Sequence, residues 1–344
     1  MVTMKNILIL GSSGQAGIST IKCLRMANIP TVKYNIITED FDPLLAGCYV
    51  GDKGYLVNKD DDKWIQDLNR IIKDENVDLI IPCHDIPLDI LANRGKEVNA
   101  PILMAKSEAV KAARDKLELN RLLVKYSMKA PVTEGGLSTK VPYPVIVKPR
   151  MGFGSKDQTI IKDNSQMEAL KTLFRTQGKK DTDFITQELL FGRELSGMIL
   201  IGKAGNILST TCAESVKKFG MSYKTIMGNE ADYALFKSEA VAAAYFMDLI
   251  GPISVQAILG TNGVFIFEIN PRFTGAQVIR ATAGVNGPDI LIRNWLDGEN
   301  DYQKVNKRLV AFWTADYLYA SEQDVDKLRS DKVTTRKAQR EDLL

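Results

Sequence analysis

The sequence contains a single histidine, His84, among 344 residues. This scarcity excludes zinc sites built from two or three histidines, and any Ser-His-Asp triad would have to use His84. The four cysteines, Cys23, Cys48, Cys83 and Cys212, include no Cys-x-x-Cys pair, so we expect neither a disulfide framework nor a zinc site. This cysteine usage favours the reducing cytoplasm.

A strong charge of one sign and long apolar runs are also absent. Lysine and arginine total 45 against 42 for aspartate and glutamate, a formal net charge of +3 that does not predict nucleic acid as the main partner. No apolar run approaches the roughly 18–20 residues of a membrane span. The first residues lack the apolar region and cleavage site of a signal peptide. We therefore expect neither a nucleic-acid nor a membrane partner.

Apolar residues make up 45% of the sequence and charged residues 25%, the ordinary mixture of a globular protein. At roughly 150 residues per domain, the length indicates about two domains. Near the N-terminus, strand-like runs at Ile7–Leu10, Thr31–Ile37 and Val77–Pro82 alternate with helical stretches. This alternation predicts an α/β fold with a parallel sheet covered on both faces, which we place at residues 1–105.

The middle of the chain is predicted to start with a helical stretch capped by Ser107 and to continue as strands. A further helix is expected to be capped by Asn164. Gly260–Gly263 separates two strand-like runs, as in a hairpin. The expected strands are Val145–Val147, Thr159–Ile161, Phe184–Gln187, Leu195–Ile201, Ile207–Thr211, Ile253–Leu259 and Val264–Ile269.

The C-terminal half contains segments with weaker patterns. Cys212–Tyr233 mixes glycine, serine, lysine and asparagine with little periodicity, which favours a functional lid or a disordered loop. Helices are expected at about Ser238–Ile250 and from Pro288 to Trp295, and a strand at Leu309–Tyr319. From Asp324 onward the chain is highly charged and is expected to fray.

The turn Gly11-x-x-Gly14-x-x-Gly17 follows the first strand and precedes a helix. Glycines allow a sharp turn and a close approach to a ligand, and a helix N-terminus attracts anions. Three interpretations are open: a structural tight turn, which we favour, a site for some other small anion, and a dinucleotide site in which Glu39 binds a ribose hydroxyl. The spacing differs from Gly-x-Gly-x-x-Gly, so the dinucleotide interpretation is weak.

A second glycine-rich loop, Met151–Lys156, links two strands rather than a strand and a helix, so it is not a Walker A loop. Gly152, Gly154 and Ser155 allow this loop to fold its amides over phosphates. Lys148, on the strand before it, supplies positive charge to those phosphates. The alternative is a plain flexible hairpin.

The segment Glu268–Arg272 closes a predicted strand. Glu268 and Asn270 are two residues apart, so they point to one face and offer the oxygen ligands that Mg²⁺ takes beside phosphates. Gln256 on the preceding strand adds a third oxygen, and Arg272 is close enough to meet a phosphate oxygen. The alternative is a solvated strand face.

The segment Gln187–Glu194 places apolar residues beside carboxylates, the groups that an adenine and a ribose require. Taken in order, these features resemble the ATP-grasp superfamily, in particular ligases similar to carbamoyl phosphate synthetase large-subunit domains, from about Lys5 to about Gly298. The resemblance implies an α/β chain with a preATP-grasp Rossmann-like parallel-sheet domain followed by a two-subdomain ATP-grasp fold. The implied regions are 1–105, the preATP-grasp domain; 106–190, a central linker helix and small lid subdomain; 191–330, a C-terminal subdomain with the metal site; and 331–344, a charged tail.

The resemblance also implies roles for individual residues. ATP contacts are implied for Lys116, Lys148, Gly152, Gly154, Ser155, Glu188, Leu190 and Glu194. Contacts to Mg²⁺, or alternatively Mn²⁺, are implied for Gln256, Glu268 and Asn270. Catalytic roles are expected for Lys148, Arg272 and Arg280, the last as a partner of a carboxylate or acyl phosphate. Gln256 departs from the Glu or Asp of many relatives, which lowers the charge of the metal site.

These assignments predict an ATP- and Mg²⁺-dependent carboxylate–amine ligase acting on small molecules. An acyl phosphate would form on a small carboxylic acid, for which an amino acid is one candidate, and an amine would displace it, releasing ADP and phosphate. The alternative is an ATP-binding regulatory or scaffold protein. A dinucleotide-dependent oxidoreductase leaves the second glycine loop unexplained. A homodimer is also considered, because relatives are often dimers.

Other residues are weaker candidates for the substrate side. Asn286 is expected to face the substrate, as is the first glycine turn. Lys217, Lys218 and Lys224 lie in the presumed loop over the site, with a solvated basic loop as an equal alternative. The lone His84, at a strand end, is interpreted as structural.

Overall fold

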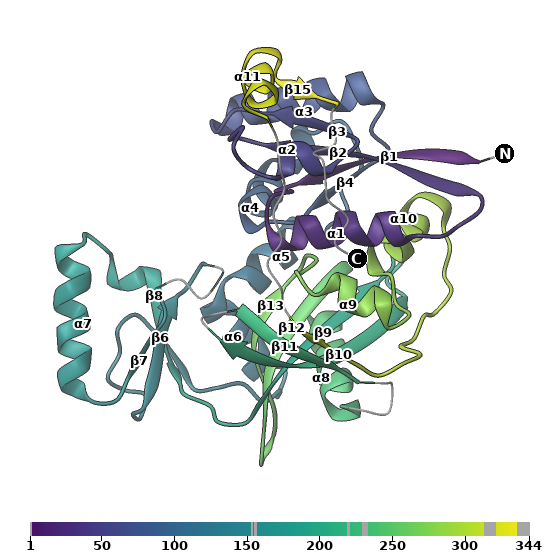
Figure 1. The fold of residues 1–344 in the computed structure, drawn as a ribbon. Helices are drawn as coiled ribbons and strands as arrows, with labels where there is room; N and C mark the ends of the chain where they lie inside the picture. Colours follow the sequence, from purple (N-terminus) through teal and green to yellow (C-terminus); the bar gives the residue numbers. More distant parts are fainter. Residues whose placement is uncertain are drawn as a thin grey trace.

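A computed structural model describes residues 2–152, 154, 157–218, 221–228, 233–312 and 321–335 of the chain. Over these residues the backbone forms three sheets in separate regions of the molecule (Figure 1). The α/β fold class is confirmed, with a largely parallel N-terminal sheet followed by two antiparallel sheets. None of the helices in the described ranges is long and apolar enough to cross a membrane.

The first sheet has the strand order β15 (Val333–Thr334), β3 (Lys53–Leu56), β2 (Val32–Asp40), β1 (Thr3–Leu10) and β4 (Leu79–Pro82). Its helices are α1 (Gln15–Met26), α2 (Gly47–Val50), α3 (Asp61–Glu75), α4 (Asp85–Arg94) and the short 3₁₀ helix η1 (Gly95–Glu97). Ile7 and Ile9 pack in the apolar cluster that includes α1, whereas Leu8 and Leu10 pack in the cluster that includes α3. Alternate residues of β1 therefore bury both faces, which explains why this strand is continuously apolar.

Two helices, α5 (Ser107–Arg114) and α6 (Lys116–Lys125), lead from the first domain to the second sheet. Asp115 separates them, because its carboxylate accepts hydrogen bonds from the amides at the start of α6 and caps that helix. The predicted cap at Ser107 is wrong, since Ser107 is the first helical residue and no side chain caps α5.

The second sheet, which we call the lid sheet, is antiparallel with the order β5 (Thr133–Gly135), β8 (Phe184–Glu188), β6 (Val145–Pro149) and β7 (Thr159–Ile161). It carries α7 (Asn164–Thr176) and the 3₁₀ helix η2 (Asp181–Asp183). Asp163 rather than the predicted Asn164 caps α7, accepting the amide hydrogen of Gln166. Val147, Met167 and neighbouring apolar side chains form a core separate from the rest of the molecule. The lid sheet is therefore held by its own apolar contacts.

The third sheet is antiparallel, with the order β13 (Gly263–Asn270), β12 (Gly251–Gly260), β9 (Arg193–Ile201), β10 (Ile207–Lys218), β11 (Met221–Met227) and β14 (Leu309–Phe312). The predicted hairpin at Gly260–Gly263 is confirmed, and it pairs β12 with β13. Helix α8 (Ala234–Phe246) packs on one face, where Phe236 and Ala240 meet Ile199 and Val255. The opposite face is left to line the site described below.

A continuous apolar core holds the first domain against the third sheet. It contains Ile9 and Ile21 of the first domain together with Leu200 of β9 and Leu291. Leu291 lies on α10 (Gly287–Asp297), which with α9 (Gln277–Thr282) packs against α1 (Figure 1). This shared core fixes α1 beside the open face of the third sheet.

The lid or disordered loop predicted at Cys212–Tyr233 is wrong over most of its length. Strands β10 and β11 occupy much of it and pair with each other. Ser215 and Thr225 are buried on these strands but polar, so the apolar alternation that marks a strand is missing from the sequence. Residues 219, 220 and 229–232, and the side chains of Lys217 and Lys218, lie outside the description.

The expectation that the chain frays from Asp324 is also wrong for the part described. Helix α11 (Glu322–Asp331) is capped by a reciprocal pair of contacts between Ser321 and Asp324. Leu328 is fully buried in a small cluster with Cys48 and Tyr49, and β15 then pairs with β3. The chain thus returns to the first domain. The predicted strand at Leu309–Tyr319 is confirmed as far as Phe312; residues 313–320 and 336–344 are not described.

Candidate active site

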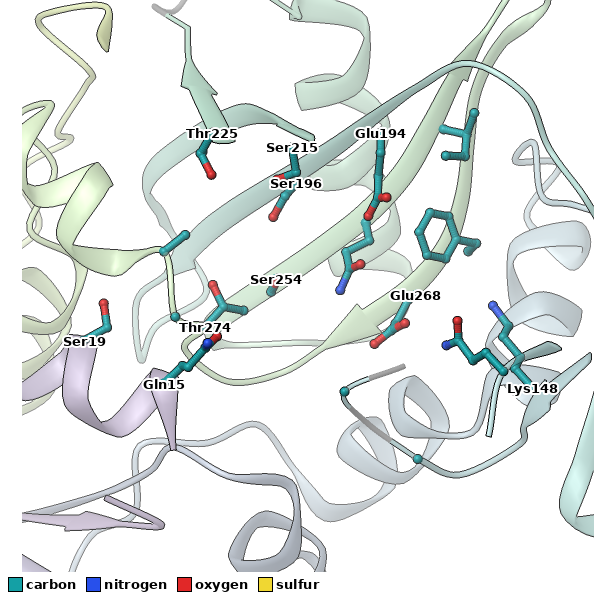
Figure 2. A pocket seen from close by; sticks show the side chains of 18 of the residues that line it. Gln15, Ser19, Lys148, Glu194, Ser196, Ser215, Thr225, Ser254, Glu268 and Thr274 are labelled. Carbon is teal, nitrogen blue, oxygen red and sulfur yellow. The ribbon is translucent and has the colours of Figure 1, made fainter. Parts of the chain in front are cut away.

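A cavity of about 920 Å³ lies where the lid sheet, the third sheet and α1 meet (Figure 2). Its lining includes most of the residues predicted to bind ATP or metal, namely Lys116, Lys148, Gly152, Gly154, Glu188, Leu190, Glu194, Gln256 and Glu268. The cavity wall does not include Asn270, Arg272 or Arg280. Ser155 lies outside the described residues.

One end of the cavity has the composition of a nucleotide site. Lys148 is buried on β6, with its Nζ 5.1 Å from the centre of the Phe267 ring. Where β8 ends, Glu188 Oε2 accepts a hydrogen bond of 3.1 Å from the amide of Val132, and Leu190 adds an apolar surface. An apolar wall with carboxylates can hold an adenine and its ribose, and Lys148 can balance phosphate charge.

The start of α6 anchors the base of the second glycine-rich loop. Lys116 Nζ donates to the carbonyl of Gly152 at 3.0 Å. Asp115 accepts three hydrogen bonds from Arg150, two from Nε at 2.8 and 2.9 Å and one from Nη2 at 2.6 Å. Burial alone raises the pKa of the Asp115 carboxyl, but the bonds from Arg150 and from the helix amides lower it overall. Asp115 therefore stays ionised and holds the loop beside Lys116.

The predicted metal residues meet on the β12–β13 hairpin. Gln256 stands directly opposite Glu268, and both line the cavity. Asn270 Nδ2 donates to Glu268 Oε1 at 2.8 Å, as the two-residue spacing predicts. Among the described residues, no group of three or more His, Cys, Asp and Glu side chains is arranged to hold a metal ion. One carboxylate with two amides suits a cation that also takes phosphate oxygens.

Arg280 is 1% exposed on α9. Its Nε donates to Thr211 Oγ1 at 3.0 Å and its Nη2 to the carbonyl of Ser196 at 3.2 Å, while Nη1 is buried without a partner. Burial lowers the pKa of this guanidinium to about 10. Arg280 is therefore connected to the cavity wall indirectly, through its hydrogen bond to the backbone of Ser196, which lines the cavity. A direct catalytic contact of Arg280 stays a prediction.

The first glycine turn is held by buried contacts. Gly11 has a φ of 66°, and its amide donates to Glu39 Oε1 at 3.0 Å. Trp64 Nε1 lies 3.4 Å from Glu39 Oε2, and burial raises the pKa of Glu39 to about 7. A carboxyl engaged in this way favours the structural interpretation over ribose binding. Ser13 and Gln15, from the same turn, nevertheless line the cavity.

Two further residues cap helices. His84 Nδ1 accepts the amide hydrogen of Ile86 at 3.3 Å and caps α4, so its structural interpretation is supported. Asn286 caps α10, and its Nδ2 donates to the carbonyl of Cys23 at 2.8 Å. Asn286 does not line the cavity, and its polar atoms bind backbone groups, so its substrate contact stays a prediction.

The opposite end of the cavity, which we call the hydroxyl end, was not predicted as a whole. Its polar lining residues are Ser13, Gln15, Ser19, Lys22, Ser196, Ser215, Thr225, Ser254 and Thr274. Figure 2 shows Gln15 and Lys148 at opposite ends of the cavity, with Glu268 between them. The hydroxyl end therefore lies beyond the predicted metal residues as seen from the nucleotide end.

Strand alternation is the signal that points to part of this end. Ser196 follows Glu194 by two residues, and Ser254 precedes Gln256 by two. Residues two apart on a strand face the same side, so each serine shares the face of a residue already predicted. The contributions of α1, β10 and β11 depend on tertiary packing and carry no such signal.

Comparisons with known proteins agree with this geometry. Residues 113–276 match the ATP-grasp domain family, and residues 7–103 match the PylC-like N-terminal domain family. The chain is 27% identical over 210 residues to tyramine–L-glutamate ligase of Methanocaldococcus jannaschii, covering 60% of this chain and 59% of that protein. It is 21% identical over 200 residues to the carbamoyl phosphate synthase large chain of Pyrococcus furiosus, covering 53% and 19%. The matches thus span less than two thirds of these relatives.

Among solved structures, N5-carboxyaminoimidazole synthetase from Staphylococcus aureus complexed with ADP is similar, with a TM-score of 0.72 at 18% identity. The similarity covers 96% of this chain and 86% of that one, and it shows the fold. The PylC-like match covers most of the first domain. The ATP-grasp match, which follows it, covers the lid sheet and strands β9 to β13 of the third sheet. The chain therefore carries a PylC-like N-terminal domain at residues 7–103, followed by an ATP-grasp domain at residues 113–276.

Proposed function

We propose that the protein is an ATP- and Mg²⁺-dependent carboxylate–amine ligase that forms ADP. The main support is that one cavity joins the predicted nucleotide residues to the hydroxyl end. Its volume of about 920 Å³ is at the upper end of the roughly 300–1,000 Å³ of small-molecule pockets, so it has room for more than a nucleotide. A relative's name, tyramine–L-glutamate ligase, pairs an amine with a carboxylic acid.

Two residues at the centre of the cavity, together with the neighbouring Asn270, fit a magnesium ion shared with the nucleotide. Gln256, Glu268 and Asn270 would hold it through oxygen atoms, with phosphate oxygens completing the coordination. When bound, Mg²⁺ neutralises charge on the phosphates during transfer. The single carboxylate of this set leaves much of that neutralisation to Lys116, Lys148 and the arginines.

The proposed reaction has two steps. A carboxylate oxygen of the acid attacks the γ-phosphorus, the bond from that phosphorus to the ADP oxygen breaks, and an acyl phosphate forms. The amine nitrogen then attacks the acyl carbon, the bond from that carbon to the phosphate oxygen breaks, and one proton is released. No protein nucleophile takes part, so the protein acts by positioning and by balancing charge.

We infer that the acid binds at the hydroxyl end. Along β12, Ser254 is next to Gln256 on the same face, so an acid whose carboxylate meets the phosphate extends toward Ser254 and α1. The hydroxyls at this end both donate and accept hydrogen bonds, and Lys22 is its charged side chain among the described lining residues. Such a wall suits a small polar acid, for which an amino acid is the leading candidate.

The test is an ADP-release screen that crosses carboxylic acids with amines. Wild-type protein should release ADP only when Mg²⁺, an acid and an amine are all present. Lys148→Ala and Glu268→Gln should each lower the rate by roughly 10²-fold, because each removes a group that binds developing charge. Lys171→Ala is the matched control, since Lys171 pairs with Glu168 on the surface of α7.

ADP release that needs no acid, or nucleotide binding without turnover for every pair, would favour the regulatory alternative. Equal activity of Lys148→Ala and Lys171→Ala would contradict the proposal that the nucleotide binds at the end of the cavity that contains Lys148.

A further inference from the structure

Asp85 connects three parts of the chain beside the candidate site. It is the first residue of α4, three residues after the C-terminal end of β4, and is 1% exposed. Its Oδ2 accepts a hydrogen bond of 2.6 Å from Arg272 Nη2, and its Oδ1 accepts one from Arg114 Nη1. A carboxylate of the first domain thus bridges an arginine of the linker helix α5 and the arginine that follows the metal strand.

Other contacts of Arg272 further restrict the orientation of its guanidinium. Its Nη1 donates to the carbonyl of Phe273 at 3.0 Å, and its Nε is buried without a partner. A guanidinium has five N–H donors. With one donor given to Asp85 and one to Phe273, one N–H on each terminal nitrogen is left for a ligand. The side chain is 14% exposed, so it is accessible over a limited area.

The cluster lies within electrostatic reach of the metal strand. Burial lowers the pKa of the Arg114 guanidinium, but neighbouring carboxylates, Glu268 among them, raise it overall. Asn270, which binds Glu268, is also two residues from Arg272, and the Arg272 amide donates to the Asn270 carbonyl at 2.8 Å. The pair of Asp85 and Arg272 is therefore linked through Asn270 to the predicted metal residue Glu268, which lines the cavity, although Arg272 is not itself part of the cavity wall.

Asp89, on the same helix as Asp85, has different contacts, so the two aspartates can be compared. Asp89 lies one helical turn further along α4 and pairs with Arg114 only, through hydrogen bonds of 3.0 and 2.9 Å. It is 40% exposed. The contact with Arg114 is common to both aspartates, whereas a role exerted through Arg272 belongs to Asp85 alone.

We propose that Asp85 is a positioning residue that orients Arg272 toward the γ-phosphate of bound ATP. The inference rests on the proposed function, because it takes Arg272 to be a phosphate ligand. Through Asp85, the first domain contributes to phosphate recognition without contacting the nucleotide. The charge-assisted hydrogen bond from Arg272 to Asp85 is stronger than one to a neutral acceptor, and the second bond, from Arg114, holds the Asp85 carboxylate in place.

The test compares binding of MgADP with that of Mg·AMP-PNP by titration calorimetry. The dissociation constant of MgADP divided by that of Mg·AMP-PNP measures how much the γ-phosphate contributes to binding, and weaker contacts to the γ-phosphate lower this ratio. Asp85→Asn should weaken Mg·AMP-PNP binding by roughly tenfold, the scale of one charge-assisted hydrogen bond, and leave MgADP within about twofold. Asp89→Asn, the matched control, should change neither constant by more than about twofold.

A double-mutant comparison links the effect to Arg272. Arg272→Gln should reduce the ratio as Asp85→Asn does, and adding Asp85→Asn to it should change the ratio by less than about twofold. Because removing a buried carboxylate can prevent folding, Asp85→Glu is the second variant. It keeps the charge but moves it by one methylene, and it should lower the ratio with little change in melting temperature.

The outcomes are distinct. If wild type binds neither nucleotide in the presence of Mg²⁺, the proposed function fails and this inference fails with it. If wild type binds both, and both Asp85 variants keep the wild-type ratio or match Asp89→Asn, only the positioning role is refuted. A tighter Mg·AMP-PNP complex in Asp85→Asn would also refute it, because Asp85 would then compete with phosphate.

Discussion

The buried carboxyl of Glu39 gives a prediction whose size follows from the structure. Burial raises the pKa of Glu39 from its ordinary value of 4.5 to about 7. A carboxyl that prefers to be neutral when folded contributes stability below pH 4.5, and that contribution is lost as the pH rises through about 7. Because each pKa unit is worth about 1.4 kcal/mol, the loss at high pH is about 3 kcal/mol.

Glu39→Gln removes this titration and keeps an oxygen for the Gly11 amide, which now donates to Glu39 Oε1. The free energy of unfolding of the variant, relative to wild type, should rise by about 2 to 3 kcal/mol between pH 5 and pH 8. Urea unfolding followed by circular dichroism at both pH values measures this difference. Titrating groups that are not coupled to Glu39 cancel in the comparison, whereas the neighbouring Asp40, whose charge helps to raise the pKa of Glu39, does not cancel fully.

Glu108→Gln serves as the control, because Glu108 is exposed in the first turn of α5. Its stability relative to wild type should not change appreciably between the two pH values. If Glu39→Gln also shows no change with pH, the burial argument for Glu39 is incorrect. In that case the structural interpretation of the first glycine turn loses its electrostatic support, and binding of NAD(P)H to that turn should be measured.

Three further predictions concern the cavity and the C-terminal segment. Lys22→Ala should raise the KM for the acid by roughly tenfold without changing the KM for ATP, because Lys22 lines the hydroxyl end; an equal rise in both constants would refute this placement. Arg150→Ala should raise the KM for ATP, since it releases the Asp115 carboxylate beside Lys116, and an unchanged KM would show that this anchor is dispensable. Leu328→Ala should destabilise the fold by about 2–5 kcal/mol in urea unfolding, and a loss below about 0.5 kcal/mol would mean that α11 does not pack on the first domain.

The predicted site residues that line the cavity are those with a local signature in the sequence. Lys148 precedes a glycine-rich loop on the same hairpin, and Glu268 lies two residues from Asn270 on one strand. Their spacing within a single element determines which side chains share a face, so the sequence carries that information.

The residues that were missed depend on contacts between distant segments. Asp85 binds Arg272 across 187 positions of the chain, and no spacing rule relates the two. Ser215 and Thr225 were assigned to a loop because polar residues that face a cavity break the apolar alternation of their strands. The burial of Leu328 likewise depends on tertiary packing, since a charged helix with few apolar residues has little sequence signal.

In the proposed mechanism, the acid is activated by transfer of a phosphoryl group to its carboxylate. The most direct measurement uses the acid that gives the greatest ADP release in the screen, labelled with ¹⁸O in both carboxylate oxygens, and analyses the phosphate by mass spectrometry. Acyl phosphate formation predicts that one ¹⁸O atom moves from the acid to each phosphate released, at the same rate as ADP appears. Unlabelled phosphate, or label recovered in AMP, would contradict the proposed ligase mechanism.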